Sequence, residues 1–292
     1  VADVNEYRSH GVNSRILGNV YARYKLLKNM ELRSSFGIDA FSSRENAFGP
    51  NFLKRTQASK GEASIGTVSG LTWLNENTLT YKPVLSENHA LDFLLGYTLQ
   101  QFNNESLLVY AFDFPDSRTG YHDISAGLLP QKPANGESEW SLVSYLGRVN
   151  YTLFNKFLFT ATGRVDGSSK FAAGKQYGFF PSGAVAWRLS DEEFVKQWTA
   201  VNELKLRASY GIIGNQAIPP YQSLSLVGAY GQGVFNGTEV YTGREPLTFA
   251  NKNLKWETTA QLDIGVDAAF WNNRLTVTAD VYQKKTSDLL LS

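Results

Sequence analysis

The stretch Gly163–Ser190, GRVDGSSKFAAGKQYGFFPSGAVAWRLS, combines residue types that can bind a polar ligand. Arg164 and Asp166 stand two positions apart, and on a β-strand such residues share a face. On that face they can contact a substrate, or they can pair with each other or across strands and stiffen a wall. The glycines and lysines after Asp166 are typical of a loop. The flanking elements therefore decide which role these charges have.

Three other patterns resemble chemical motifs, but each has a plainer structural explanation. GIIGNQ at Gly211–Gln216 lacks the GxxxxGK[ST] spacing of a phosphate loop and is typical of a strand end with turn glycines. His10, His89 and His122 lack the spacing of metal ligands. The acidic run Asp191–Glu193 is typical of a solvated helix start rather than a catalytic carboxylate pair. With no cysteine in the chain, a thiol nucleophile is excluded as well. We therefore predict no catalytic residue, no metal site and no cofactor, and hence no enzyme.

The charge balance argues against a nucleic-acid partner. The 292 residues carry 28 Lys and Arg against 27 Asp and Glu, a formal net charge of +1, whereas nucleic-acid-binding domains carry a basic excess. No run of 18 apolar residues occurs, so no transmembrane helix is expected. A membrane β-barrel has no such run either, because each of its strands is apolar on only one face.

Alternation of apolar and polar residues is the dominant pattern. Trp256–Phe270 alternates with a period of two, and after Asn272-Asn273 the run Leu275–Tyr282 does the same, which predicts a hairpin. Four more hairpins are predicted in the same way: Ile16–Leu26 with Met30–Ile38, Leu71–Pro83 with Leu91–Leu99, Val143–Leu153 with Phe157–Val165, and Phe180–Leu189 with Leu204–Ile212. We therefore expect about ten strands of roughly 10 to 15 residues, which is longer than most strands of globular proteins.

The connections alternate between short and long. Tight turns are expected at Lys28-Asn29, Ser86–His89, Asn155-Lys156 and Asn272-Asn273. Long loops are expected at Ser43–Gly70, Asn104–Glu139 and Asn215–Asn253, with a medium loop at Gly167–Tyr177. Ser190–Val201 is the exception, since Ser190 and Glu193 have capping-box spacing and predict one or two helical turns. Short turns at one end and long loops at the other are the layout of an all-β, transmembrane antiparallel β-barrel of an outer membrane.

Several segments resemble successive signatures of one family. They are NYTLFNKFLFTATGRVDGSSKFAAGKQYGFFPS, WRLSDEEF, LKLRASYGIIGNQ and LKWETTAQLDIGVDAAFWNNRLTVTADVYQKKTSDLL. Together they resemble the SusC/RagA-type TonB-linked (TonB-dependent) outer-membrane transporters of Bacteroidetes. The resemblance is dense from about Glu139 to Leu291, and the first 138 residues fit only the architecture.

The resemblance implies a 22-stranded barrel with an N-terminal plug in its lumen, in the outer membrane of a Gram-negative cell. It implies energised import of a large nutrient, an oligosaccharide or a peptide. The implied partners are a SusD-like surface lipoprotein, the TonB-ExbB-ExbD complex and outer-membrane lipid. The chain lacks the family's signal peptide, plug, TonB box and final aromatic strand. Residues 1–292 are therefore expected to be a segment of a single outer-membrane β-barrel domain, with the plug domain and the C-terminal strands outside it.

Two groups of residues are candidates for the transport path. Charged residues on the predicted lumen face can line the path or hold the plug: Arg148, Arg164, Asp166, Arg207, Glu257 and Asp263. Aromatic residues of the 215–253 loop can stack on a substrate or contact a lid protein: Tyr221, Tyr230, Phe235 and Tyr241. Each group also has a structural alternative, which is stiffening of the wall for the charges and loop-on-loop packing for the aromatics. Four further aromatics near strand ends are predicted to form interfacial girdles: Trp256, Trp271, Tyr151 and Phe270.

Two other functional classes compete with import. A barrel of similar ancestry can serve as a structural scaffold or as a subunit of an outer-membrane or secretion complex, in which case the lumenal residues only fill space. A soluble β-sandwich or a glycosidase is the third class. The expected strand length and the apolar outer face argue against that third class.

Overall fold

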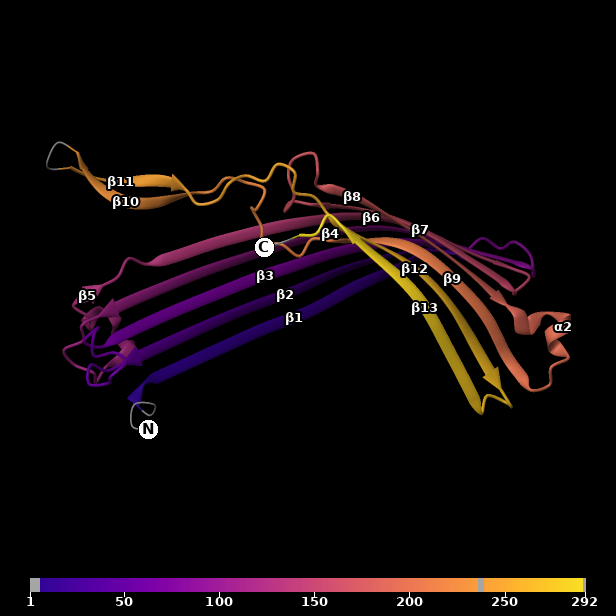
Figure 1. Cartoon of the computed structure of the whole chain (residues 1–292), viewed down its shortest axis with the longest axis horizontal. Helices are drawn as coiled ribbons and strands as arrows, with labels where there is room; N and C mark the ends of the chain where they lie inside the picture. Colours follow the sequence, from indigo (N-terminus) through magenta and orange to yellow (C-terminus); the bar gives the residue numbers. More distant parts are fainter. Residues whose placement is uncertain (1–5, 236–238, 291–292) are drawn as a thin grey trace. The chain divides into compact units, whose positions relative to one another are not determined.

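The computed structural model describes residues 6–235 and 239–290, and they form an antiparallel all-β structure (Figure 1). The main sheet has eleven strands, ten of them in the order β1-β2-β3-β4-β6-β7-β8-β9-β12-β13, while β5 pairs only with β4. The strands are β1 Arg8–Leu27, β2 Met30–Gly49, β3 Glu62–Tyr81, β4 His89–Phe112, β5 Leu129–Pro130, β6 Ala134–Leu153, β7 Phe157–Ser168, β8 Tyr177–Arg188, β9 Val201–Asn215, β10 Val227–Phe235, β11 Glu239–Pro246, β12 Glu257–Phe270 and β13 Leu275–Ser287. The five predicted hairpins and the predicted fold class are confirmed. Among the described residues, no helix is both long enough and apolar enough to cross a membrane.

Two predicted loops are shorter than expected, because the strands continue into them, and the third contains strands of its own. The predicted bounds of the loop at Ser43–Gly70 are wrong at both ends, since β2 runs to Gly49 and β3 begins at Glu62. The loop expected at Asn104–Glu139 shrinks in the same way, because β4 extends to Phe112 and β6 begins at Ala134. These added ends do not alternate regularly between apolar and polar residues, although the backbone pairing continues. In the third region β10 and β11 form a separate two-stranded sheet.

The chain divides into two compact units. One unit comprises Val1–Val20, Phe36–Leu74 and Gln100–Trp140. Its core is the buried cluster Phe48, Ala63, Ala111 and Phe114, against which Tyr121, Ile124 and Ala126 pack. These last three residues belong to the short 3-10 helices η1 (Gly120–His122) and η2 (Ile124–Ala126) between β4 and β5. The long connection after β4 is therefore held down by apolar contacts.

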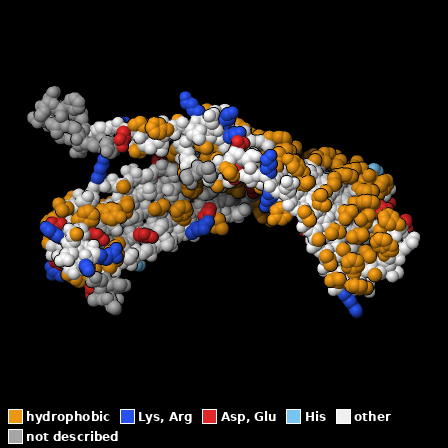
Figure 2. All heavy atoms as spheres, in the orientation of Figure 1, with side chains coloured by type: hydrophobic (Ala, Val, Ile, Leu, Met, Phe, Trp, Pro, Cys, Tyr) orange, Lys and Arg blue, Asp and Glu red, His pale blue; other side chains and the backbone are white. Residues whose placement is uncertain are grey.

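The other unit comprises Tyr21–Ser35, Asn75–Leu99 and Ser141–Ser292. The register from β6 to β13 gives it two chemically different faces. We call the first the apolar face, and large side chains are well exposed on it: Tyr145, Phe159, Val185, Leu206, Tyr210, Leu262 and Ile264. Figure 2 shows hydrophobic side chains gathered over the part of the sheet formed by β9, β12 and β13. The opposite side, which we call the polar face, carries mainly charged, hydroxyl and amide groups.

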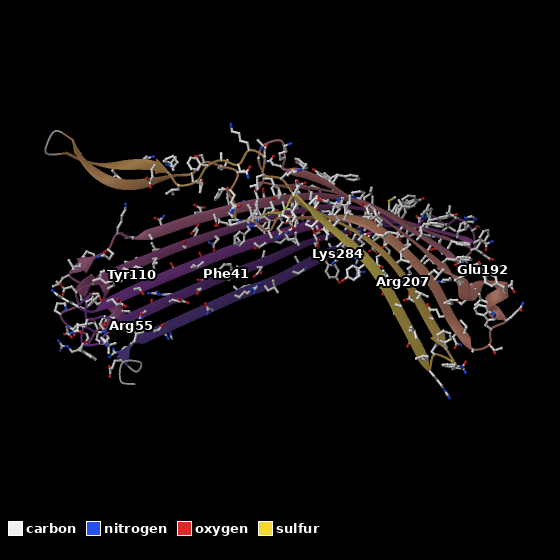
Figure 3. All side chains as sticks on the ribbon, in the orientation of Figure 1. Phe41, Arg55, Tyr110, Glu192, Arg207 and Lys284 are labelled. Carbon is white, nitrogen blue, oxygen red and sulfur yellow. The ribbon has the colours of Figure 1, made fainter. Side chains whose placement is uncertain are left out.

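The helical turns predicted at Ser190–Val201 are present, but their cap is different from the prediction. The 3-10 helix η3 (Leu189–Asp191) leads into α2 (Glu193–Lys196), whose N-cap is Glu192 without a side-chain capping bond. Ser190 lies inside η3, so it cannot form the expected capping box with Glu193. The Glu192 carboxylate instead accepts hydrogen bonds from Lys156 Nζ at 2.8 Å and from Trp187 Nε1 at 3.1 Å (Figure 3). It thereby ties the helical turns to the β6–β7 turn and to β8.

This contact predicts a pH dependence. The hydrogen bond from Lys156, supported by that from Trp187, lowers the pKa of the Glu192 carboxyl. The ionised form is therefore favoured by folding, so its contribution is complete above the ordinary carboxyl pKa of about 4.3 and is lost as pH falls through the lowered value. We expect the melting temperature of the wild type to fall more steeply below about pH 5 than that of Glu192→Gln. Asp191→Asn is the control and should follow the wild type, whereas equal slopes for wild type and Glu192→Gln would contradict the assignment.

Candidate functional site

The polar face is the candidate functional surface of the second unit. It exists because every second residue of each strand points to it, and the register aligns polar residues across neighbouring strands. Arg148 lies opposite Thr162 and donates from Nε to its Oγ1 at 3.2 Å. Thr160 lies opposite Asn150 and donates from Oγ1 to its Oδ1 at 2.9 Å. The face can therefore offer hydrogen-bonding groups to a polar molecule.

Arg164 and Asp166 of β7 form a close pair on this face. Arg164 Nε lies 2.7 Å and 2.8 Å from the two Asp166 carboxylate oxygens, and Arg164 Nη2 donates to Ser144 Oγ at 2.9 Å. Asp166 is only 8% exposed and Ser144 only 1% exposed. A buried carboxylate needs such partners, because an unpaired charge there is costly. Asp166 is therefore paired with Arg164 within the wall.

A second charge cluster centres on Arg207 of β9, which Figure 3 labels. Its Nε and Nη2 bind the Asp267 carboxylate at 2.8 Å and 2.9 Å, and Nη2 also reaches Asp280 at 3.0 Å. Lys205 Nζ lies 3.7 Å from Asp267. A side chain at Gly265, directly opposite Arg207, would collide with Arg207 and Asp280. Glycine is thus the residue that leaves room for an ion-pair network across three strands.

Sequence reasoning found Arg207 but not its partners Lys205, Asp267 and Asp280. All three occupy polar-face positions of the predicted alternation, so the sequence does predict the face of the sheet to which their side chains point. The sequence does not reveal the register of β9, β12 and β13, which places these charged residues next to one another. Without it, a charge on one strand cannot be matched to a charge on the next.

The remaining predicted charged residues form fewer hydrogen bonds and ion pairs. Glu257 accepts from Asn215 Nδ2 and from the backbone N–H of Leu290, both at 3.0 Å, so it fastens the segment after β13. Within residues 6–235 and 239–290, the side chain of Asp263 has no hydrogen bond or ion pair. Arg148 has no acidic partner in that same part of the chain. Asp263 and Arg148 are therefore the predicted path residues most able to bind something else.

The predicted loop aromatics fall in and beside the β10–β11 hairpin. Tyr221 precedes the hairpin with a left-handed backbone (φ 68°). Tyr230 and Phe235 lie on β10 and Tyr241 on β11, but the side chains of these three lie outside the described residues. Their proposed contacts with a substrate or a lid stay a prediction.

Trp256 does not belong to an interfacial girdle, so that prediction is wrong. Its ring is 7% exposed and packs against Phe171 and Phe180 with centroid distances of 4.9 Å and 5.3 Å. Trp256 Nε1 donates to Gln176 O at 2.8 Å. The indole therefore clamps the β7–β8 loop, to which Phe171 and Gln176 belong, onto the sheet. Trp271, by contrast, is 58% exposed, as a girdle residue should be.

No group of three or more His, Cys, Asp or Glu side chains that could hold a metal occurs in the part of the chain the structure describes. The polar face offers charged, hydroxyl and amide groups. It can bind a polar molecule through charges and hydroxyls, and it can hold a neighbouring protein segment.

Comparisons with known proteins agree with this architecture. The family described as "TonB dependent receptor-like, beta-barrel" matches residues 3–292. TonB-dependent receptor P3 of Formosa agariphila is 38% identical over 272 residues, covering 93% of this chain and 27% of that protein. TonB-dependent receptor SusC of Bacteroides thetaiotaomicron is 45% identical over 156 residues, covering 52% of this chain and 15% of that protein.

A solved structure matches nearly the whole chain. The structure of the RagAB peptide transporter superposes with a TM-score of 0.90 at 24% identity, covering 99% of this chain and 32% of that chain. The chain spans 27% to 28% of the length of the two curated relatives P3 and P26 of Formosa agariphila. The match over residues 3–292 shows that this chain belongs to the TonB-dependent receptor-like β-barrel family, and it is an outer-membrane barrel sequence similar over half its length to SusC.

Proposed function

We propose that the chain is a wall segment of a larger single barrel that imports a nutrient across the outer membrane. The observation that carries the proposal is the two-faced sheet of the second unit, with large apolar side chains exposed on one face and ion pairs on the other. An apolar band that faces lipid and a polar lumen are what a membrane barrel needs. Passage through such a lumen requires binding and release, with no covalent step.

The cargo proposed is an oligosaccharide or a peptide, too large for an ordinary porin. Its support is the family, since one similar protein is named SusC and one similar structure is titled a peptide transporter. The proposed partners are a SusD-like surface lipoprotein and the TonB-ExbB-ExbD complex that energises uptake. A plug and a lid of the full-length protein would be the moving parts.

Deletion of the full-length gene, in the organism that carries it, tests the proposal. Growth should be lost on one class of oligosaccharide or on peptides as sole nutrient, and restored by the gene on a plasmid. A protonophore should abolish uptake of the labelled nutrient in the complemented strain. Unchanged growth on every oligosaccharide and peptide, with envelope or secretion subunits co-purifying in place of a lipoprotein, would favour a scaffold role instead.

The two least engaged charges provide a test at the level of residues. We expect Asp263→Asn combined with Arg148→Gln to raise the apparent KM for uptake several-fold, because both groups are free to contact cargo or plug. Barrel assembly, measured by heat-modifiable mobility, should be unchanged. Thr162→Val is the matched control on the same face, since it removes only the hydroxyl that Arg148 contacts. A normal KM in the double variant would remove these two residues from the path.

A further inference from the structure

The first unit carries a row of aromatic side chains on the neighbouring strands β2, β3, β4 and β6. Phe41, labelled in Figure 3, belongs to β2, and Trp140 of β6 stacks on Phe102 of β4 with a centroid distance of 5.9 Å. On β3, between β2 and β4, stands Gly70, where any side chain would collide with the Phe41 ring. We call Phe41, Phe102 and Trp140 the aromatic row. All three side chains are only half-buried, so each presents part of its ring to a ligand.

The aromatic row lies on the side of the strands that we propose to face the lumen. Along β6, Trp140 alternates in step with Ser144, whose hydroxyl accepts from Arg164 on the polar face. Along β4, Phe102 alternates out of step with Ala111, which belongs to the buried core on the other side. The core therefore does not cover the row, and a molecule that passes through the lumen can reach it.

A hollow lies on each side of the row along the strands. One has a volume of about 470 Å³, and its lining includes Ser43, Glu45, Gly66, Ser106 and Gly136. The other has a volume of about 520 Å³, and its lining includes Asn19, Gly37, Asp39, Thr72 and Gln100. On β2, Phe41 stands between them, and the path from Gly37 to Glu45 is about 25 Å long at ~3.3 Å per residue. The row and the two hollows, which together we call the track, can therefore hold a chain of several units.

The polar groups of the track have little charge to offer. Asp39 is already paired, because Arg15 Nε donates to its carboxylate at 2.7 Å. Among residues 6–235 and 239–290, the side chain of Glu45 has neither a hydrogen bond nor an ion pair, so its oxygens can accept from a ligand. Thr72 and Gln100 add a hydroxyl and an amide, each of which can both donate and accept. The track thus combines aromatic faces with neutral hydrogen-bonding groups and one carboxylate.

This combination matches the chemistry of a neutral sugar chain. The C–H groups of a pyranose ring form an apolar face that packs on an aromatic ring, and the hydroxyls at its edge donate to carboxylates and amides. An extended peptide binds best to an unpaired strand edge, whereas β2, β3, β4 and β6 are each paired on both sides. An anionic chain would be repelled by Glu45, while Arg15 is already paired with Asp39.

We propose that the track binds a neutral oligosaccharide, with sugar rings stacked on Phe41, Phe102 and Trp140 and hydroxyls bonded to Glu45. The inference rests on the proposed import function and narrows its cargo from an oligosaccharide or a peptide to a neutral oligosaccharide. Phe41 and Phe102 stand two strands apart, about 10 Å at ~4.8 Å between neighbouring strands. The row therefore offers separate platforms to different units of one chain, which favours an oligosaccharide over a single sugar.

The first experiment measures binding by calorimetry on the full-length protein, extracted from native membranes in mild detergent with any chains that co-purify. The probes are neutral hexasaccharides of glucose, mannose, galactose, xylose and arabinose, a hexasaccharide of galacturonic acid, and a mixture of random hexapeptides. We expect at least one neutral hexasaccharide to bind more tightly than the acidic sugar and the peptides. Binding of none of the neutral sugars, or tighter binding of the acidic sugar or the peptides, would overturn the inference.

The second experiment repeats the titration on variants that heat-modifiable mobility shows to be assembled. Phe102→Ala with Trp140→Ala should weaken binding of the preferred sugar by about tenfold or more, because two stacking surfaces are lost. Trp140→Phe keeps an aromatic face and should retain most of the affinity. Trp73→Ala is the matched control and should bind as the wild type does, since Trp73 stacks on Phe36 at 6.3 Å on the opposite side of the same strands.

Unchanged affinity in the double variant would show that the aromatic row packs against the rest of the barrel instead, and would overturn the inference. Failure of this inference can be told from failure of the proposed function, because binding in detergent needs no energised uptake. A protein that imports peptides but binds no sugar would contradict only the inference. A protein that binds the sugar through the row but imports nothing would contradict only the proposed function.

Discussion

Val149→Lys should block or strongly impair assembly of the barrel. Val149 stands on the apolar face, opposite Ala161 and two register steps from the stacked rings of Tyr151 and Phe159. A lysine on the lipid face near the bilayer midplane costs ~2–4 kcal/mol, a large part of the stability of an ordinary domain. Heat-modifiable mobility and the yield of folded protein in the outer-membrane fraction measure this effect.

The adjacent residue provides the matched control. Asn150 points to the opposite face, where its carbonyl accepts the Thr160 hydroxyl. Asn150→Lys adds the same charge one position away, on the side proposed to be wet, and costs no more than that one hydrogen bond, about 1 kcal/mol. We expect it to assemble. Equal failure of both variants would mean that the two faces are not chemically different, and equal success would mean that the apolar face does not meet lipid.

Trp256→Ala should release the β7–β8 loop from the sheet. The indole is almost fully buried between Phe171 and Phe180, and its N–H holds the backbone at Gln176. Removing a buried tryptophan typically costs ~3–5 kcal/mol, and the hydrogen-bond acceptor at Gln176 is then left without its donor. Because the cluster sits at one end of the sheet, the loss should appear first as local opening rather than global unfolding.

Trypsin provides the measurement, because Lys170 and Lys175 lie in the loop that the indole holds. When opening is fast relative to cleavage, a change of ~3–5 kcal/mol in the opening equilibrium speeds cleavage by about 10²-fold to 4 × 10³-fold. Trp271→Ala is the control, since that ring is 58% exposed and its removal should leave cleavage of the loop unchanged. Slow cleavage in Trp256→Ala would show that other contacts fix the loop.

Strands could be predicted from the sequence wherever one face is apolar and the other polar. The hairpin of β12 and β13 is an example, because its alternation and its Asn272-Asn273 turn are both local signals. The added ends of β2, β3, β4 and β6 could not be predicted, because their residues do not alternate regularly between apolar and polar and only backbone pairing marks the strand. Backbone hydrogen bonds between strands do not depend on the type of side chain, so they produce no periodic pattern in the sequence.

Some features of the candidate site could likewise be predicted from the sequence, and others could not. Residues two positions apart on a strand point to the same face of the sheet. For this reason the pair of Arg164 and Asp166 could be predicted from the sequence. The Arg207 network required a register across three strands. Trp256 was misassigned because the alternation continues through it, although β12 begins only at Glu257. The side chain of a residue just before a strand does not have to follow the alternation of that strand. The direction of the Trp256 side chain is therefore decided by its burial against Phe171 and Phe180.

The length of β2, β3, β4 and β6 has a consequence for the cell surface. These strands have 20 to 24 residues, whereas about 9–11 residues are enough to cross the hydrocarbon. The excess, roughly 25–35 Å along the membrane normal at ~3.3 Å per residue and ~40° tilt, has to stand outside the bilayer. It carries the connection after β4 past the sugar-bearing headgroups of the outer leaflet. We therefore expect this part of the wall to be the portion that antibodies and bacteriophages can reach.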